Sequence, residues 1–208
     1  LFDSLPQGPL ELPRWEGPPT RIEAFAGRPL LLYLWAQWHA QSSAGLARLV
    51  AESAYLDAAG IALFPLSLDE LRDGGSARSL VEGLVPVGER GGRADATTQM
   101  LIELSFVETI GNFADLQLPA ALLYDGSGAL CVLYLGAVDA RQLQADAIAI
   151  ESLRASSPGL SRWPTGLTGG RWALRPPARN LEPLQKLYER GGFSALARAM
   201  QQALQARR

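Results

Sequence analysis

Cysteine and histidine are nearly absent from this chain. Its 208 residues include one cysteine, Cys131, and one histidine, His39. A single cysteine excludes a disulfide within the chain and leaves the redox compartment open. The lone histidine has no cluster of cysteines or carboxylates beside it, and a zinc site needs three or four ligands. We therefore expect no metal and no cofactor.

Long apolar runs and a strong charge of either sign are also missing. No apolar run approaches the roughly 20 residues that span a bilayer, and no signal peptide is present. The net charge of -2 gives no reason to expect nucleic acid as a partner. The chain starts at Leu1 without a methionine and stops within a helical pattern at Arg208. We therefore expect a piece of a longer bacterial protein.

What the chain does contain is an alternation of strand and helix patterns, which predicts an α/β fold. The run Pro29–Trp35 is apolar on both sides, as in a central strand covered on both faces. A helical pattern over 41–59 follows and ends at Gly60, and Ile61–Leu68 is a second buried strand. This strand–helix–strand unit predicts two parallel neighbours with a right-handed crossover.

The following region predicts a second set of elements and completes a sheet of four or five strands. Its glycine-rich turn predicts an antiparallel hairpin, because glycine accepts positive φ. The expected elements are a short helix Ala77–Gly83, a loop Gly88–Arg93, a helix Thr97–Thr109, a strand Leu118–Tyr124, the turn Asp125–Gly128, a strand Ala129–Leu135 and a helix Ala140–Leu153. The glycines of the loop do not follow a strong strand, so we do not interpret them as a phosphate-binding loop.

The two ends of the chain differ from this middle part in composition. Residues 1–20 are rich in proline and predict an extended lead-in, followed by a short edge strand at Arg21–Phe25. Residues 155–180 predict a connector, and 181–208 predict a helical hairpin. The hairpin pattern fits one tetratricopeptide repeat and fits an ordinary C-terminal hairpin equally well. The main domain is expected over 21–154.

Two short motifs carry a resemblance to a known family. The first is Trp35-Ala36-Gln37-Trp38-His39-Ala40-Gln41-Ser42, at the junction of a strand and a helix, and the second is Leu118-Pro119, before a hairpin. This order resembles the TlpA/ResA-like branch of the thioredoxin-like superfamily, whose junction reads W-A-x-W-C-x-x-C. The resemblance covers about residues 20–154. It implies a thioredoxin-like central mixed sheet with helices on both faces, and a cis bond before Pro119.

The departures from the family pattern bear on function. His39 and Ser42 stand at the two cysteine positions, and Gly45 replaces a glutamate common in this branch. Thiol–disulfide exchange needs an attacking thiolate and a second, resolving thiol. We therefore expect a redox-inactive domain that binds protein or extended peptide, and by resemblance an extracytoplasmic one. The expected binding residues are Trp35, Trp38, His39, Ser42, Leu118 and Pro119.

Other functions remain open at this stage. One alternative is a thiol-disulfide oxidoreductase or peroxiredoxin-like enzyme that uses an unrecognised thiol, and another is a structural spacer. Cys131 lies in an apolar strand pattern and is expected to be buried and slow to react. His39 has no acid to orient it as in a catalytic triad, so we expect a polar residue at a vacated active site. Neither catalysis nor metal binding is expected of it.

Overall fold

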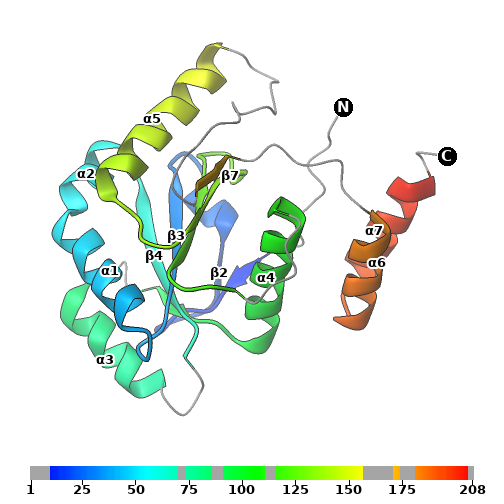
Figure 1. The fold of residues 1–208 in the computed structure, drawn as a ribbon, viewed down its shortest axis with the longest axis horizontal. Coiled ribbons are helices and arrows are strands. Elements are labelled where there is room, and N and C mark those ends of the chain that lie inside the picture. The colour runs from blue at the N-terminus through cyan, green and yellow to red at the C-terminus, as the bar shows by residue number, and fades with distance from the viewer. Residues whose placement is uncertain are drawn as a thin grey trace.

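A computed structural model describes residues 10–69, 74–85, 91–110, 116–156, 171–173 and 181–205. Strand β3 (Leu30–Trp35) lies at the centre of its main sheet and pairs in parallel with β4 (Ala62–Ser67), as predicted. On its other side β3 pairs antiparallel with β6 (Ala120–Tyr124), which forms the expected hairpin with β7 (Leu130–Leu135). Helices cover both faces of the sheet (Figure 1).

The sheet has six strands in the described residues, in the order β5-β4-β3-β6-β7-β8, so the expected number of four or five is wrong. The additional strands are short and lie at the two edges. Strand β5 (Gly92–Arg93) falls within the predicted loop, and β8 (Arg171–Ala173) falls within the predicted connector. Two or three residues are too few for a period-two pattern, so neither strand shows in the sequence.

The strands at the centre form because both of their faces are covered. All residues of β3, β4 and β6 are buried. One core lies between the sheet and helices α1 (Ala40–Ala51), α2 (Ser53–Ala58), α3 (Gly74–Leu84) and α5 (Ala140–Ser156). The other lies between the sheet and the 3-10 helix η1 (Ile22–Phe25) and α4 (Ala96–Ile110).

One expected helix is two helices. The pattern over 41–59 is interrupted at Glu52, whose backbone (φ -102°, ψ 20°) leaves the helical region between α1 and α2. The apolar spacing continues through this residue because Leu49 and Leu56 both reach the same core, and for that reason the sequence does not reveal the break. Gly60 has φ of 64°, which matches the expected helix stop.

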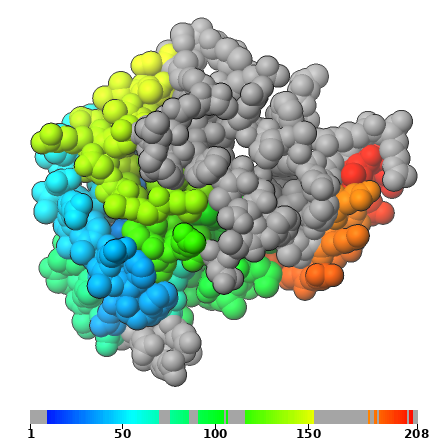
Figure 2. All heavy atoms as spheres, in the orientation of Figure 1, coloured from blue at the N-terminus to red at the C-terminus, as the bar shows by residue number. Residues whose placement is uncertain are grey.

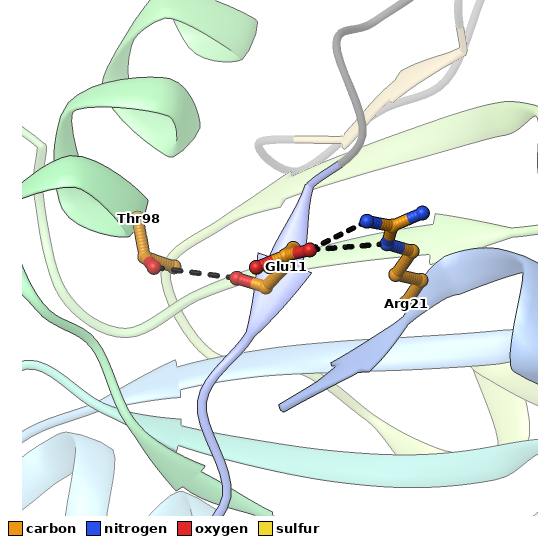
Figure 3. A network of polar contacts seen from close by, with 3 residues as sticks. All are labelled: Glu11, Arg21 and Thr98. Atoms are coloured by element: carbon orange, nitrogen blue, oxygen red, sulfur yellow. Dashed lines mark hydrogen bonds and ion pairs between the residues drawn. The ribbon is translucent and has the colours of Figure 1, made fainter. Parts of the chain in front are cut away.

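The predicted lead-in contributes to the fold. Strands β1 (Glu11–Leu12) and β2 (Thr20–Arg21) pair antiparallel, so the expected edge strand at Arg21–Phe25 is wrong beyond its first residue, where η1 begins. Leu12 is fully buried. Glu11 forms an ion pair with Arg21, and its carbonyl accepts a hydrogen bond from the Thr98 hydroxyl of α4 at 3.3 Å (Figure 3). The expected boundary at residue 20 thus lies inside β2.

The same N-terminal segment covers the edge of the sheet at β5. The Trp15 amide donates to the Gly91 carbonyl at 3.0 Å. A Cβ on Gly92 would collide with the Pro13 carbonyl, and one on Gly91 would collide with the Pro65 carbonyl. The two glycines therefore allow close packing of three backbone segments.

The C-terminal hairpin consists of α6 (Leu181–Arg190) and α7 (Ser194–Gln205), with the chain reversal at Gly191-Gly192 as expected. Tyr188, Ala197 and Met200 form a small core with Leu104 of α4. The hairpin lies on the side of the molecule away from α1 and α3 (Figure 2). Whether it is a repeat unit, and where the connector ends, stay predictions, since most of 155–180 lies outside the described residues. No helix in the described part is long and apolar enough to cross a membrane.

Candidate functional site

The candidate site forms at the carboxyl end of β3, where three segments meet. Trp35 ends β3 and pairs with Ser67, the last residue of β4. Leu34 pairs with Ala120, the first residue of β6, so this register places Pro119 beside Trp35. The Trp35–Ser42 motif and the Leu118-Pro119 pair are far apart in the sequence. The pairing of the strands brings them next to each other.

His39 is the N-cap residue of α1. Its backbone is extended (φ -104°, ψ 93°), and its Nδ1 accepts a hydrogen bond from the Ser42 amide at 3.2 Å. In a neutral ring this acceptor role places the proton on Nε2. His39 therefore caps the N-terminus of α1, a role that serine, threonine or aspartate usually has.

Ser42 is fully buried beneath this turn. Its Oγ accepts a hydrogen bond from the Ala36 amide at 3.1 Å and lies 2.8 Å from the His39 carbonyl, to which it can donate. The hydroxyl therefore fastens the loop after β3 to the first turn of α1. With no exposure, and with its oxygen accepting one hydrogen bond and its proton available to the His39 carbonyl, it is not an accessible nucleophile.

The two tryptophans of the motif have opposite environments. Trp35 is fully buried, and its Nε1 has no hydrogen-bond partner among the described residues. Trp38 is 68% exposed, and its ring meets His39 edge to face at a centroid distance of 5.8 Å. Trp35 thus belongs to the core beneath the site, whereas Trp38 belongs to the surface of the site.

Leu118 and Pro119 lie next to the motif, at the start of β6. The peptide bond between them is cis, as predicted. Pro119 is buried, and its carbonyl accepts from the Gly136 amide at 2.8 Å, while Leu118 is half-buried. The cis bond and the helix start thus lie at one end of the sheet.

Asp69 belongs to this end of the sheet and was missed by the sequence analysis. It is 2% exposed, and both carboxylate oxygens lie 3.0 Å from the Gln37 amide. Its Oδ2 also accepts from the Ser67 hydroxyl at 2.7 Å. A signal was available: Asp69 directly follows a buried strand that was predicted to be the parallel neighbour of β3, and such strands end at the same sheet edge.

Gly45 provides room for a buried phenol. The Tyr33 hydroxyl donates to the Ser42 carbonyl at 3.0 Å, and a Cβ on Gly45 would collide with that hydroxyl. Tyr33 is fully buried, and its desolvation raises the pKa of the phenol well above its ordinary value. The hydroxyl therefore stays protonated and acts as a fixed donor.

The site as described offers hydrogen bonds and an aromatic surface but no thiol. Cys131 is buried in β7, level with Leu30 at the amino end of β3, since Leu130 pairs with Tyr124 and Tyr124 with Leu30. At about 3.3 Å per residue, this is roughly 15 Å along the strands from Trp35. The described residues contain no group of three histidines, cysteines or acids that could hold a metal.

Comparisons with known proteins identify the architecture. No protein-family model and no curated protein matches the chain. Among solved structures, StoA from Bacillus subtilis is 14% identical, with a TM-score of 0.50 over 68% of this chain and 98% of that one. DsbF from MTB is 19% identical, with a TM-score of 0.49 over 69% and 96% of the two chains.

A thiol:disulfide interchange protein DsbE from Chlorobium tepidum is 18% identical, with a TM-score of 0.48 over 72% of this chain and 93% of that one. Identities this low bear on the fold and not on the reaction. The sheet order, the position of α1 after Trp35 and the hairpin after Pro119 agree with the fold that the sequence resemblance implies. The chain has a thioredoxin-like fold.

Proposed function

We propose that this domain is redox-inactive and binds protein or extended peptide at the carboxyl end of β3. The observation that supports it best is the contrast within the motif. Both cysteine positions are occupied by side chains engaged in local hydrogen bonds, His39 and Ser42, while Trp38 between β3 and α1 is 68% exposed.

An exposed indole has a large potential for contact. Covering about two thirds of a side chain of roughly 200 Å² stabilises a complex by on the order of 3 kcal/mol. In the described residues the other large apolar side chains that are exposed are Met100 and Ile148, on α4 and α5. Trp38 lies in the loop between β3 and α1, at the end of the sheet where the register places Pro119 beside Trp35. An extended chain is a suitable partner because it offers backbone groups and side chains together.

The enzyme alternative requires a thiol within reach of the site. Cys131 is 1% exposed and lies at the other end of the sheet, so its use would need β7 to separate from its neighbours. The spacer alternative requires no ligand and predicts that Trp38 can be replaced without consequence.

Two measurements on the wild-type protein, the second repeated on two variants, separate these functions. The first is reduction of insulin with dithiothreitol as electron source, for which we expect the background rate. The second is binding of reduced, carboxymethylated insulin B chain, an extended polypeptide without free thiols. Trp38→Ala should weaken that binding about 30- to 100-fold. Ile148→Ala, which removes an exposed apolar side chain from α5, is the matched control and should not weaken it.

Each alternative has its own outcome. Insulin reduction above background by the wild type would support the oxidoreductase. Binding that Trp38→Ala leaves unchanged would place the binding surface elsewhere. Absence of binding to the B chain, together with no reduction, would favour the spacer.

A further inference from the structure

We propose that Asp69 is a positioning residue, which holds the loop Gln37–Trp38 in place and thereby presents the exposed indole of Trp38. The inference rests on the proposed function only for its effect on peptide affinity. The order of the loop can be measured without any peptide.

The geometry of Asp69 is unusual for a buried carboxylate. Both oxygens face one amide, that of Gln37, at 3.0 Å, and no basic side chain of the described residues forms an ion pair with it. A buried carboxylate is costly unless hydrogen bonds satisfy it. The Ser67 hydroxyl donates the second hydrogen bond, to Asp69 Oδ2 at 2.7 Å. The same hydroxyl accepts a hydrogen bond from the Asp69 amide at 3.1 Å.

The loop that Asp69 holds has few other anchors. Gln37 and Trp38 are exposed, so core packing does not fix them. Ala36 before them is held by Ser42, and His39 after them caps α1. Between these two anchors, the hydrogen bond from the Gln37 amide to Asp69 ties the loop backbone to the segment that follows β4. A hydrogen bond to a charged acceptor is stronger than one to a neutral acceptor.

The bond therefore limits how far the Trp38 backbone can move. A preordered side chain loses less conformational entropy when a partner binds. Replacing the carboxylate should loosen the loop and reduce affinity for the partner without removing any residue that touches it.

The test compares Asp69→Asn with Asp125→Asn. Asp125 is also 2% exposed, but it lies in the hairpin turn at the opposite end of the sheet. Hydrogen exchange of the Gln37 amide is measured in each variant, together with the fluorine spectrum of protein labelled with 5-fluorotryptophan. The Trp38 signal is assigned with Trp38→Phe among the five tryptophans. Ser67→Ala, which removes one bond to Asp69, is the milder variant should Asp69→Asn not fold.

We expect Asp69→Asn to speed exchange of the Gln37 amide about tenfold or more and to move the Trp38 fluorine signal toward that of free tryptophan. Binding of reduced, carboxymethylated insulin B chain should weaken about five- to tenfold. Asp125→Asn should change none of the three. Unchanged exchange and an unchanged Trp38 signal in Asp69→Asn, or equal changes in Asp125→Asn, would overturn the assignment. If both signals change as expected but the wild type binds no B chain, the positioning role stands and the proposed function fails.

Discussion

The two ends of the central sheet each carry a buried polar network, and they differ in what they leave exposed. At the carboxyl end of β3, Asp69, Ser42 and His39 bind backbone amides beneath an exposed Trp38. At the amino end, Asp125 accepts from Ser127, Ala129 and Cys131.

The network at the amino end of β3 is closed to solvent, and we call this end of the sheet the closed end. Its carboxylate is 2% exposed and its thiol 1% exposed. The same type of interaction thus supports a surface at one end and seals a turn at the other. A buried polar network alone therefore does not identify a functional site. The two ends of the sheet differ in the exposed side chain of Trp38, which only the carboxyl end has.

The largest expected effect comes from giving the carboxyl end the thiols it lacks. In His39→Cys/Ser42→Cys, both thiols stand at the start of α1, where the helix N-terminus favours a thiolate. We expect insulin reduction to rise from background to a rate at least about 100-fold higher, because attacking and resolving thiols are then paired. The assay follows insulin precipitation with dithiothreitol.

His39→Cys alone is the control, since it lacks the resolving thiol and should turn over poorly. A double variant that folds normally and stays inert would contradict the view that this end of the sheet is a vacated thiol site.

The thiol at the closed end should be protected. Cys131 donates to Asp125 Oδ2 at 3.0 Å, so both burial and the neighbouring carboxylate disfavour its thiolate. We expect labelling by Ellman's reagent at pH 8 to be at least about 100-fold slower than in guanidinium chloride, since it requires local opening. Asp125→Ala should speed labelling about tenfold by loosening the turn.

Asp69→Asn, at the other end of the sheet, serves as the control and should leave the labelling rate unchanged. Equal acceleration by both variants would mean that the two ends open together, and the comparison would not hold.

A smaller effect tests how tightly α1 packs on β3. Gly45→Ala places a Cβ against the buried Tyr33 hydroxyl. We expect the free energy of unfolding to fall by about 1–3 kcal/mol, as in other overpacked cores, although alanine favours helix by about 1 kcal/mol. Urea denaturation measures the change.

Gly45→Ala/Tyr33→Phe removes the colliding oxygen, and the next atom of the ring, Cζ, is 3.4 Å from the new Cβ. The double variant should therefore be more stable than Gly45→Ala alone. If it is less stable, the collision is not the cause of the loss.

The smallest effect is a difference in sign between two buried tyrosines. The Tyr33 hydroxyl has the Ser42 carbonyl as partner, whereas the Tyr124 hydroxyl, toward the closed end, is buried without one in the described residues. Tyr33→Phe should lower the free energy of unfolding by about 1 kcal/mol, and Tyr124→Phe should raise it by a similar amount. Loss of stability in both variants, measured by urea denaturation, would show that Tyr124 has a partner after all.

Much of this organisation follows from the sequence. The apolar run of β3 and β4, the hairpin turn after Tyr124 and the start of α1 near His39 are local patterns, and the structure contains them. The break at Glu52 and the short edge strands could not be predicted, because apolar spacing continues through the former and the latter are too short for periodicity.

For the candidate site, the sequence supplied the residue types and the structure decided their roles. Trp35 and Trp38 are the same residue type and cannot be told apart from composition. In the structure Trp35 pairs with Ser67 and is buried in the core, whereas Trp38 is exposed. The contribution of Asp69 was not visible either, since the Gln37 amide that it binds lies 32 residues away in the chain.

By itself, the sequence determined the α/β order of elements, the absence of a second cysteine and the residues at the helix start, because these depend on local propensity and composition. Tertiary structure alone decided which end of the sheet carries the thiol and which carries the exposed indole. The physical reason is register: pairing Leu34 with Ala120 and Leu30 with Tyr124 sets Pro119 beside Trp35 and carries Cys131 to the opposite end.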